Sequence, residues 1–229
     1  ILKDLAPFVP ALSRFEEPLD LNLVFSGHGK HLDCPTLRLT NHHGLMIAGE
    51  AALSNWDAGT DMYIYGKLGN LTMTKEGINV LMTNLTGKVP PILQRLDYIR
   101  FNGEAAGYLH DLTLTGLFHT GAGMVKTDVM MSIDEQSMSR TYSGSVASAD
   151  LDLGKLLNQE KKFGKVDFNV ELKGFNYKNR YPESYIKGII SSFEYSQYQY
   201  ENIMLDGVYK DGGFNGRLSM DDANGSVQI

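Results

Sequence analysis

Cysteine, positive charge and long apolar runs are all scarce in this sequence. Its single cysteine cannot form an internal disulfide framework or a zinc module built from several cysteines. Lys and Arg number 21 against 27 Asp and Glu, a net charge of −6 without basic runs, which argues against nucleic acid as a partner. No stretch approaches the roughly 20 apolar residues that a membrane-spanning helix needs. Because 42% of the 229 residues are hydrophobic, the composition is nevertheless that of a folded chain rather than a disordered one.

The first residues of the sequence are also informative. The chain begins Ile1-Leu2-Lys3, with neither methionine nor a signal peptide. We therefore interpret the sequence as a piece of a longer protein and expect any targeting or anchoring segment to lie outside it.

Most of the chain alternates apolar and polar residues, which is typical of strands with one buried face. Runs of this kind begin near Leu19, Leu112, Val166, Ile203 and Phe214. Between such runs lie Asn-, Asp- and Gly-rich segments, which suit the positive φ angles of tight hairpins. The sequence therefore predicts a mostly β, antiparallel protein.

Three segments have helical spacing of apolar residues instead, over residues 2–15, 78–96 and 153–161. Internal prolines interrupt the first two, so we expect short broken helices there. Each segment leads into a strand that we expect to end at Gly27, Gly103 or Gly174. This pattern predicts three repeat units, 1–75, 76–148 and 149–229, within one continuous domain. Residues 175–184 are expected to form a long exposed loop.

Candidate chemistry is sparse. His28, His31 and Cys34 could in principle bind zinc, but a spacing of three along a strand places neighbouring members on opposite faces. The glycines at 121–123 lack the pattern of a dinucleotide fingerprint, and no nucleophile motif occurs. We therefore expect no catalytic residues, no metal site and no cofactor.

Three segments resemble the TamB (translocation and assembly module) family of the AsmA-like superfamily. They are residues 4–12 (DLAPFVPAL), 149–157 (ADLDLGKLL) and 205–218 (LDGVYKDGGFNGRL). The resemblance covers essentially the whole chain and fits an internal stretch of a much longer protein. It implies an elongated, curved antiparallel sheet, a β-taco-like groove with an apolar interior. To this fold the sequence itself adds the short broken helices between the repeat units.

The resemblance also implies a function without catalysis. Members of the family are anchored in the inner membrane, span the periplasm and are linked to phospholipid transport toward the outer membrane. They also support outer-membrane protein assembly with TamA or another BamA-related protein, which would bind through regions outside this fragment. On this basis we expect the partners of this segment to be phospholipid acyl chains. The expected lining of the groove is Leu21, Leu23, Phe25, Leu112, Leu114, Phe168, Val170, Phe214 and Leu218.

The sequence leaves three alternatives open. The same apolar residues could fill the closed core of a β-sandwich. The strand edges could template β-barrel client proteins by β-augmentation. A tyrosine cluster that includes Tyr195, Tyr198 and Tyr200 could form a carbohydrate-binding platform, or these residues could be ordinary strand-forming aromatics.

Overall fold

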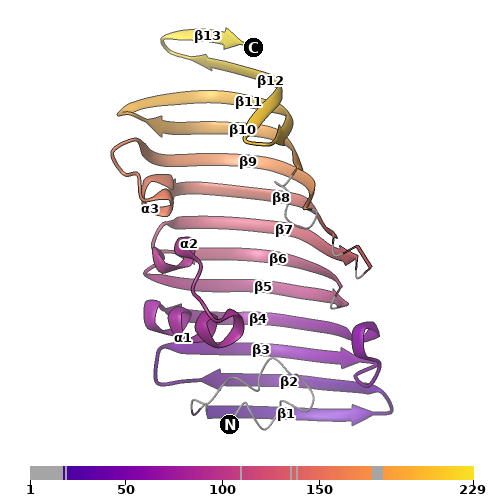
Figure 1. The fold of residues 1–229 in the computed structure, drawn as a ribbon. Coiled ribbons are helices and arrows are strands. Elements are labelled where there is room, and N and C mark those ends of the chain that lie inside the picture. Colours follow the sequence, from indigo (N-terminus) through magenta and orange to yellow (C-terminus); the bar gives the residue numbers. More distant parts are fainter. Residues whose placement is uncertain (1–17, 19, 109, 135, 138, 177–182) are drawn as a thin grey trace.

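The computed structural model describes residues 18, 20–108, 110–134, 136–137, 139–176 and 183–229. They form one open, curved antiparallel sheet of thirteen strands in which each strand pairs with the next along the chain (Figure 1). Strands account for 71% of the structure, which confirms the predicted fold class. The strands are β1 (Asp20–His28), β2 (His31–Thr40), β3 (Leu45–Ser54), β4 (Tyr63–Thr74), β5 (Tyr98–Tyr108), β6 (Asp111–Thr120), β7 (Gly123–Asp134), β8 (Ser139–Asp152), β9 (Phe163–Asn176), β10 (Glu183–Tyr195), β11 (Tyr198–Lys210), β12 (Gly213–Asp222) and β13 (Gly225–Gln228).

The helices follow the local signals in the sequence. Helix α1 (Lys75–Thr86) begins after Thr74, whose hydroxyl accepts a hydrogen bond from Gly77 N at 3.2 Å. It ends at Gly87, whose φ of 77° closes the last turn. Pro90 stands at the N-cap of α2 (Pro91–Gln94), which begins with Pro91 and forms one further turn, so the predicted broken helix is confirmed.

Two shorter helical turns complete the described elements. Helix α3 (Leu153–Leu157) is capped by the Asp152 carboxylate, which accepts from Lys155 N at 2.8 Å. A 3-10 turn, η3 (Gly59–Asp61), joins β3 to β4. The first predicted helical segment, residues 2–15, lies outside the described residues. None of the helices in the described ranges is long and apolar enough to cross a membrane.

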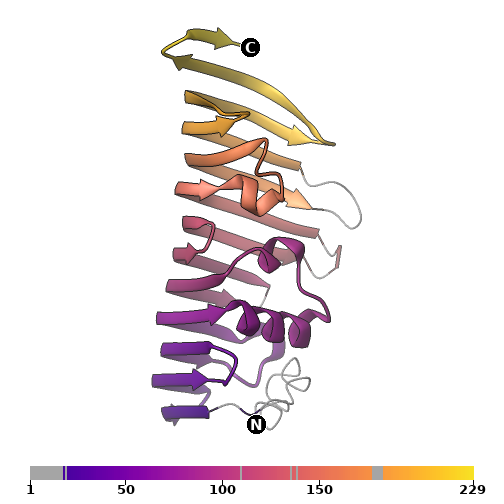
Figure 2. The ribbon, with the colours of Figure 1, turned by 90° about the vertical axis from the view of Figure 1, so that its left-hand side faces the viewer.

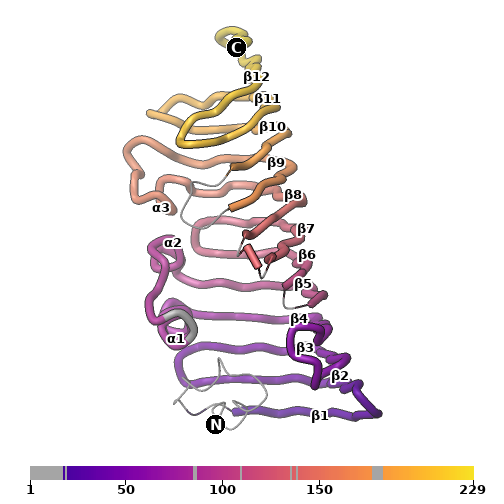
Figure 3. The backbone as a smooth tube through the Cα atoms, turned by 45° about the vertical axis from the view of Figure 1, so that its right-hand side comes forward, coloured from indigo at the N-terminus to yellow at the C-terminus, as the bar shows by residue number. Residues whose placement is uncertain are grey.

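The sheet is bent along its strands, and the helices lie on the side toward which it bends (Figures 1 and 2). We call this concave, helix-bearing face the inner face and the opposite one the outer face. Helices α1, α2 and α3 all connect strands at the same end, which we call the helical rim. Figure 3 shows the strands stacked in chain order, with β1 and β13 at opposite edges of the sheet.

The best-buried part of the molecule is a small cluster beneath these helices. Ile78 of α1 is 1% exposed and packs with Leu96, Ile99 and Ala122. Partly buried side chains surround this cluster, among them Phe118 of β6. Elsewhere the described residues place no second sheet over the inner face, so they do not form the closed sandwich that the sequence left open.

Two details of the predicted repeat differ from the structure. Strand β5 continues past Gly103 to Tyr108, and β9 continues past Gly174 to Asn176. The register also places Gly107, not Gly103, in line with Gly27 and Gly174. These strand ends were therefore predicted wrongly, because the sequence shows alternation but not how far each ladder extends.

The division into units 1–75, 76–148 and 149–229 stays a prediction. Its second boundary falls inside β8. The sheet itself is continuous across both boundaries.

Candidate functional site

The inner face carries an unbroken line of paired side chains across the whole sheet. Antiparallel partners share a face, so the strand register shows directly which residues stand side by side. The line includes Phe101, Phe118 and Phe168, and we call it the phenylalanine row. Its members are Leu21, Leu39, Ile47, Leu71, Phe101, Phe118, Val125, Ser148, Phe168, Ile190, Ile203, Met220 and Val227. Only Ser148 is polar, so this row forms a nearly continuous apolar track.

A second inner row runs beside the first and combines aliphatic side chains with glycines. Its members are Leu23, Leu37, Gly49, Leu68, Gly103, Gly116, Thr127, Val146, Val170, Gly188, Leu205 and Leu218. We call it the glycine row. At its centre, the Phe101 ring occupies the space that Cβ atoms on Gly103 and Gly116 would fill. The glycines thus let a large ring lie flat along the inner face.

All nine predicted lining residues fall on this inner face. Leu21 and Phe168 belong to the phenylalanine row, and Leu23, Val170 and Leu218 to the glycine row. Three more stand in the next two lines of the inner face. Leu114 lies between Ala105 and Val129, and Leu112 lies between Gly107 and Met131. Phe214 stands opposite Tyr209. Phe25 lies between Leu23 and Gly27 on the same face of β1, at an irregularity where it has no direct partner on β2, and it is 65% exposed.

The outer face has the opposite character. Its central line, which we call the charged row, consists of Glu50, Lys67, Glu104, Thr115, Asp128, Ser145, Glu171, Lys187, Asp206 and Arg217. Lys67 Nζ lies 3.6 Å from Glu104 Oε1, and Thr115 Oγ1 donates to Asp128 Oδ1 at 2.9 Å. The sheet therefore separates an apolar concave face from a charged, solvated one.

One carboxylate of the charged row has a perturbed titration. The Tyr185 hydroxyl donates to Asp206 Oδ1 at 2.6 Å, which lowers the pKa of Asp206 and raises the pKa of Tyr185. The nearby Lys187 ammonium, 3.5 Å from Asp206 Oδ2, further lowers the pKa of Asp206. Both side chains are solvated. We interpret their hydrogen bond as a structural contact between neighbouring strands on the outer face and not as a catalytic acid–base pair.

The helical rim is held together by polar contacts between distant segments. Lys155 Nζ of α3 donates to Asp97 Oδ2 at 2.6 Å and to the Gly121 carbonyl at 2.9 Å. Its hydrogen bond and charge lower the pKa of Asp97. The Arg95 guanidinium donates to the Leu156 carbonyl. These contacts connect the α2–β5 junction, the β6–β7 turn and α3.

After α3 the helical rim carries no further helix in the described residues, and an aromatic cluster lies at the strand ends there. It consists of Phe163, Phe193, Tyr195, Tyr198 and Tyr200. The rings of Tyr198 and Tyr200 meet edge-on with centroids 4.6 Å apart, and those of Phe163 and Tyr195 are 5.4 Å apart. The tyrosines noted in the sequence are thus gathered with two phenylalanines into one patch.

The register places this aromatic cluster on the inner face. Phe193 pairs with Val166, which stands two residues before Phe168 of the phenylalanine row and is 4% exposed. A bulge between Ile190 and Ser192 shifts the alternation of β10, so that Phe193 joins the inner face. Simple alternation from Ile190 would have assigned Phe193 to the outer face, which is why the sequence did not connect the tyrosines with the groove.

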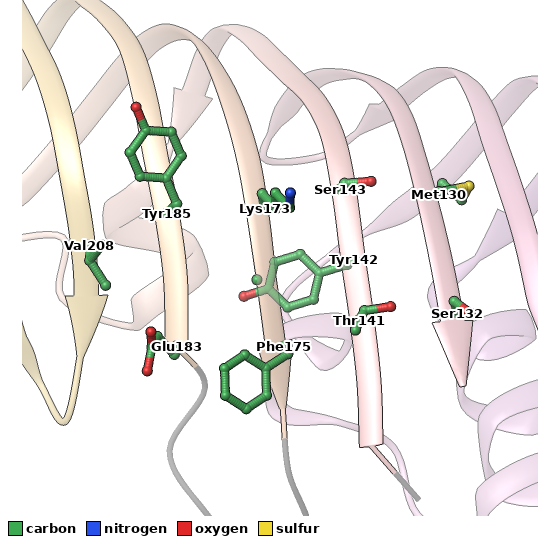
Figure 4. A pocket seen from close by; sticks show the side chains of 11 residues that line it. Met130, Ser132, Thr141, Tyr142, Ser143, Lys173, Phe175, Glu183, Tyr185 and Val208 are labelled. Atoms are coloured by element: carbon green, nitrogen blue, oxygen red, sulfur yellow. The ribbon is translucent and has the colours of Figure 1, made fainter. Parts of the chain in front are cut away.

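A hollow of about 610 Å³ lies on the outer side of the sheet, away from the helical rim (Figure 4). Met130, Ser143, Lys173, Tyr185 and Val208 line it and form one outer-face row. None of the nine predicted lining residues borders it. Tyr142 and Gly174, which the register places in line with Leu112 on the inner face, also border the hollow, whereas no member of the phenylalanine or glycine row does.

The histidines and the cysteine do not converge. His31 Nδ1 lies 2.8 Å from Ser54 Oγ and its Nε2 lies 3.1 Å from Asp33 Oδ1, while the Cys34 thiol donates to the Thr36 carbonyl. Within the ranges that the structure describes, no three His, Cys, Asp or Glu side chains gather closely enough to hold a metal ion.

Comparisons with protein-family models, with curated proteins and with solved structures give no match.

Proposed function

We propose that this chain is a segment of a periplasm-spanning envelope protein similar to the TamB family, and that its inner face binds phospholipid acyl chains in transit toward the outer membrane. The observation that carries this proposal is the phenylalanine row, which runs through all thirteen strands of an open, concave sheet. An acyl chain needs a continuous apolar surface and no chemical group to react with. We accordingly propose a role without catalysis.

The energetics of the inner face suit such a ligand. Removing a methylene group from water contributes about 0.8 kcal/mol, so an acyl chain can be held without specific contacts. The thirteen strands are separated by twelve steps. At about 4.8 Å a step the row is roughly 55–60 Å long, several times the ~15 Å depth of one bilayer leaflet. Part of the row is covered, because Leu71 and Phe118 pack against the cluster beneath α1 and α2. In that section a chain would move from strand to strand over the neighbouring inner-face lines.

The remaining parts of the proposal concern regions outside this fragment. We place the segment in the periplasm, within a protein anchored in the inner membrane by another region. Its support of outer-membrane protein assembly would depend on TamA or another BamA-related protein, again bound elsewhere. The charged row fits an aqueous compartment, because it exposes one whole face of the sheet to solvent.

Site-specific photocrosslinking in cells tests the proposal. A photoreactive amino acid at Leu114 or Phe168 on the inner face is expected to capture phospholipid, detected by mass spectrometry of the purified adduct. The matched controls are Asn169 and Lys126, which the register places on the outer face. Absence of lipid adducts at both inner positions, or equal yields on the two faces, would contradict the proposal.

A second candidate function is a scaffold for β-barrel clients. Every residue of β1 is exposed, and among the described residues only β2 pairs with it. Such an edge offers backbone donors and acceptors to an incoming strand. This candidate predicts crosslinks from β1 to client strands instead of lipid adducts on the inner face.

A further inference from the structure

The inner face changes character where the aromatic cluster borders the helical rim. Apart from Ser148 and Thr127, the phenylalanine and glycine rows offer apolar surface, whereas the cluster adds three tyrosine hydroxyls at the strand ends. Tyr195 is 38% exposed, and the Tyr198 hydroxyl donates to Asp222 Oδ2 at 3.0 Å. Tyrosine is typical of boundaries where one end of a ligand is apolar and the other is hydrated.

Two lysines stand next to this boundary. Lys161 and Lys162 lie in the turn between α3 and β9, and both are exposed. The Lys162 carbonyl accepts a hydrogen bond from Ser196 N at 2.7 Å, which fixes this turn beside the β10–β11 hairpin that carries Tyr195 and Tyr198. Phe163, a member of the aromatic cluster, follows Lys162 directly.

The acidic groups nearby leave this positive charge available. Glu194 lies between Phe193 and Tyr195, which both face inward, so its side chain lies on the outer face. Its carboxylate packs there over Gly164, where an added Cβ atom would meet it. Lys165 already pairs with Asp150 at 3.0 Å. In the turn itself Glu160 is the one acidic neighbour of Lys161 and Lys162.

We propose that this end of the inner face is a headgroup site, in which Lys161 and Lys162 bind the phosphate of an anionic glycerophospholipid and the aromatic cluster contacts its glycerol region. The acyl chains would then lie on Phe168 and Val170, the adjoining members of the two inner rows. The inference rests on the proposed function and adds to it the orientation and charge class of the lipid. A neutral lipid without phosphate would fit the apolar rows equally well but gain nothing from the lysines.

The test compares two probes with the same fluorescent acyl chain, one a phosphatidylglycerol and the other a diacylglycerol without phosphate. We expect the protein to bind the phosphatidylglycerol more tightly. Lys161→Gln with Lys162→Gln should weaken that binding by about tenfold and leave diacylglycerol binding unchanged. The matched control is Lys126→Gln with Lys173→Gln, which removes the same charge from the outer face. Tyr195→Ala should weaken both probes, and Tyr195→Phe should restore most of the loss.

The outcomes separate this inference from the proposal beneath it. If both probes bind equally, or if the rim and control double variants behave alike, the headgroup site is wrong while acyl-chain binding stands. If neither probe binds, the proposed function and the headgroup site both fail. A salt-insensitive preference for phosphatidylglycerol would also overturn the role of the lysines, because exposed charge pairs weaken as ionic strength rises.

Discussion

The ring of Phe101 on β5 covers Gly116 on β6, so closely that a Cβ atom on Gly116 would lie 2.5 Å from a ring carbon. Phe101 is only 5% exposed, and its ring also contacts that of Phe118, with centroids 4.5 Å apart. A glycine is thus what lets a large aromatic side chain lie against the inner face instead of projecting from it.

Gly116→Ala is therefore expected to lower the free energy of unfolding by about 1–3 kcal/mol, because the added methyl group must displace the Phe101 ring or the backbone beside it. Chemical denaturation measures the loss. The matched control is Gly66→Ala on β4, also on the inner face, where a Cβ atom would meet nothing within 4 Å. Similar losses at Gly116 and Gly66 would show that the ring contact is not the cause.

The cluster beneath the helices gives a second prediction. Ile78→Ala should cost roughly 2–5 kcal/mol, since Ile78 is 1% exposed and its removal leaves a cavity between α1 and the sheet. Ile92→Ala on α2 is the control, because Ile92 is 48% exposed and its truncation should change stability by less than about 1 kcal/mol. A small effect at Ile78 would mean that α1 is not packed on the inner face as described.

The inner face was largely predictable from the sequence because strand alternation is a local signal. Leu112 and Leu114 share a face in any regular strand, as do Phe168 and Val170. The broken helix was equally visible, since the prolines at 90 and 91 interrupt it. Each of these features follows from neighbouring residues in the sequence and does not depend on which strands pair.

Register and bulges could not be predicted in the same way. The bulge between Ile190 and Ser192 moves Phe193 to the inner face, and positive φ at Asn202 marks a matching irregularity in β11. Hydrogen bonds between strands set these features, and a single residue of slip reverses every side chain beyond it. The aromatic cluster therefore became part of the inner face only in the structure.

The Lys155–Asp97 pair gives a prediction about pH. Because Lys155 lowers the pKa of Asp97 in the folded state, the pair stabilises the protein above the ordinary carboxyl value of 3.8, and this stabilisation is lost as the pH falls through the folded-state pKa. Lys155→Met should thus be less stable than the parent near neutral pH, with the difference narrowing as the pH falls below the ordinary carboxyl value of 3.8. Denaturation midpoints across this range measure it.

The control for this titration is Lys126→Met on the outer face of β7, for which the described residues provide no ion pair. Its midpoint should track that of the parent at every pH. A Lys155→Met deficit that stays constant into acid would assign the effect to the hydrogen bond with the Gly121 carbonyl instead.

The last prediction concerns the charge of the inner face. Leu114→Glu places a carboxylate among Ala105, Val129 and the neighbouring apolar rows, where an acyl chain would have to desolvate it. We expect phospholipid to co-purify with the parent protein and this variant to lose most of it, as measured by lipid extraction and mass spectrometry. Leu117→Glu makes the same chemical change on the same strand but on the outer face, opposite Lys126, and should retain the lipid. Equal retention by both variants would mean that lipid does not occupy the inner face at β6, whereas equal loss with both proteins folded would mean that the two faces are not functionally distinct.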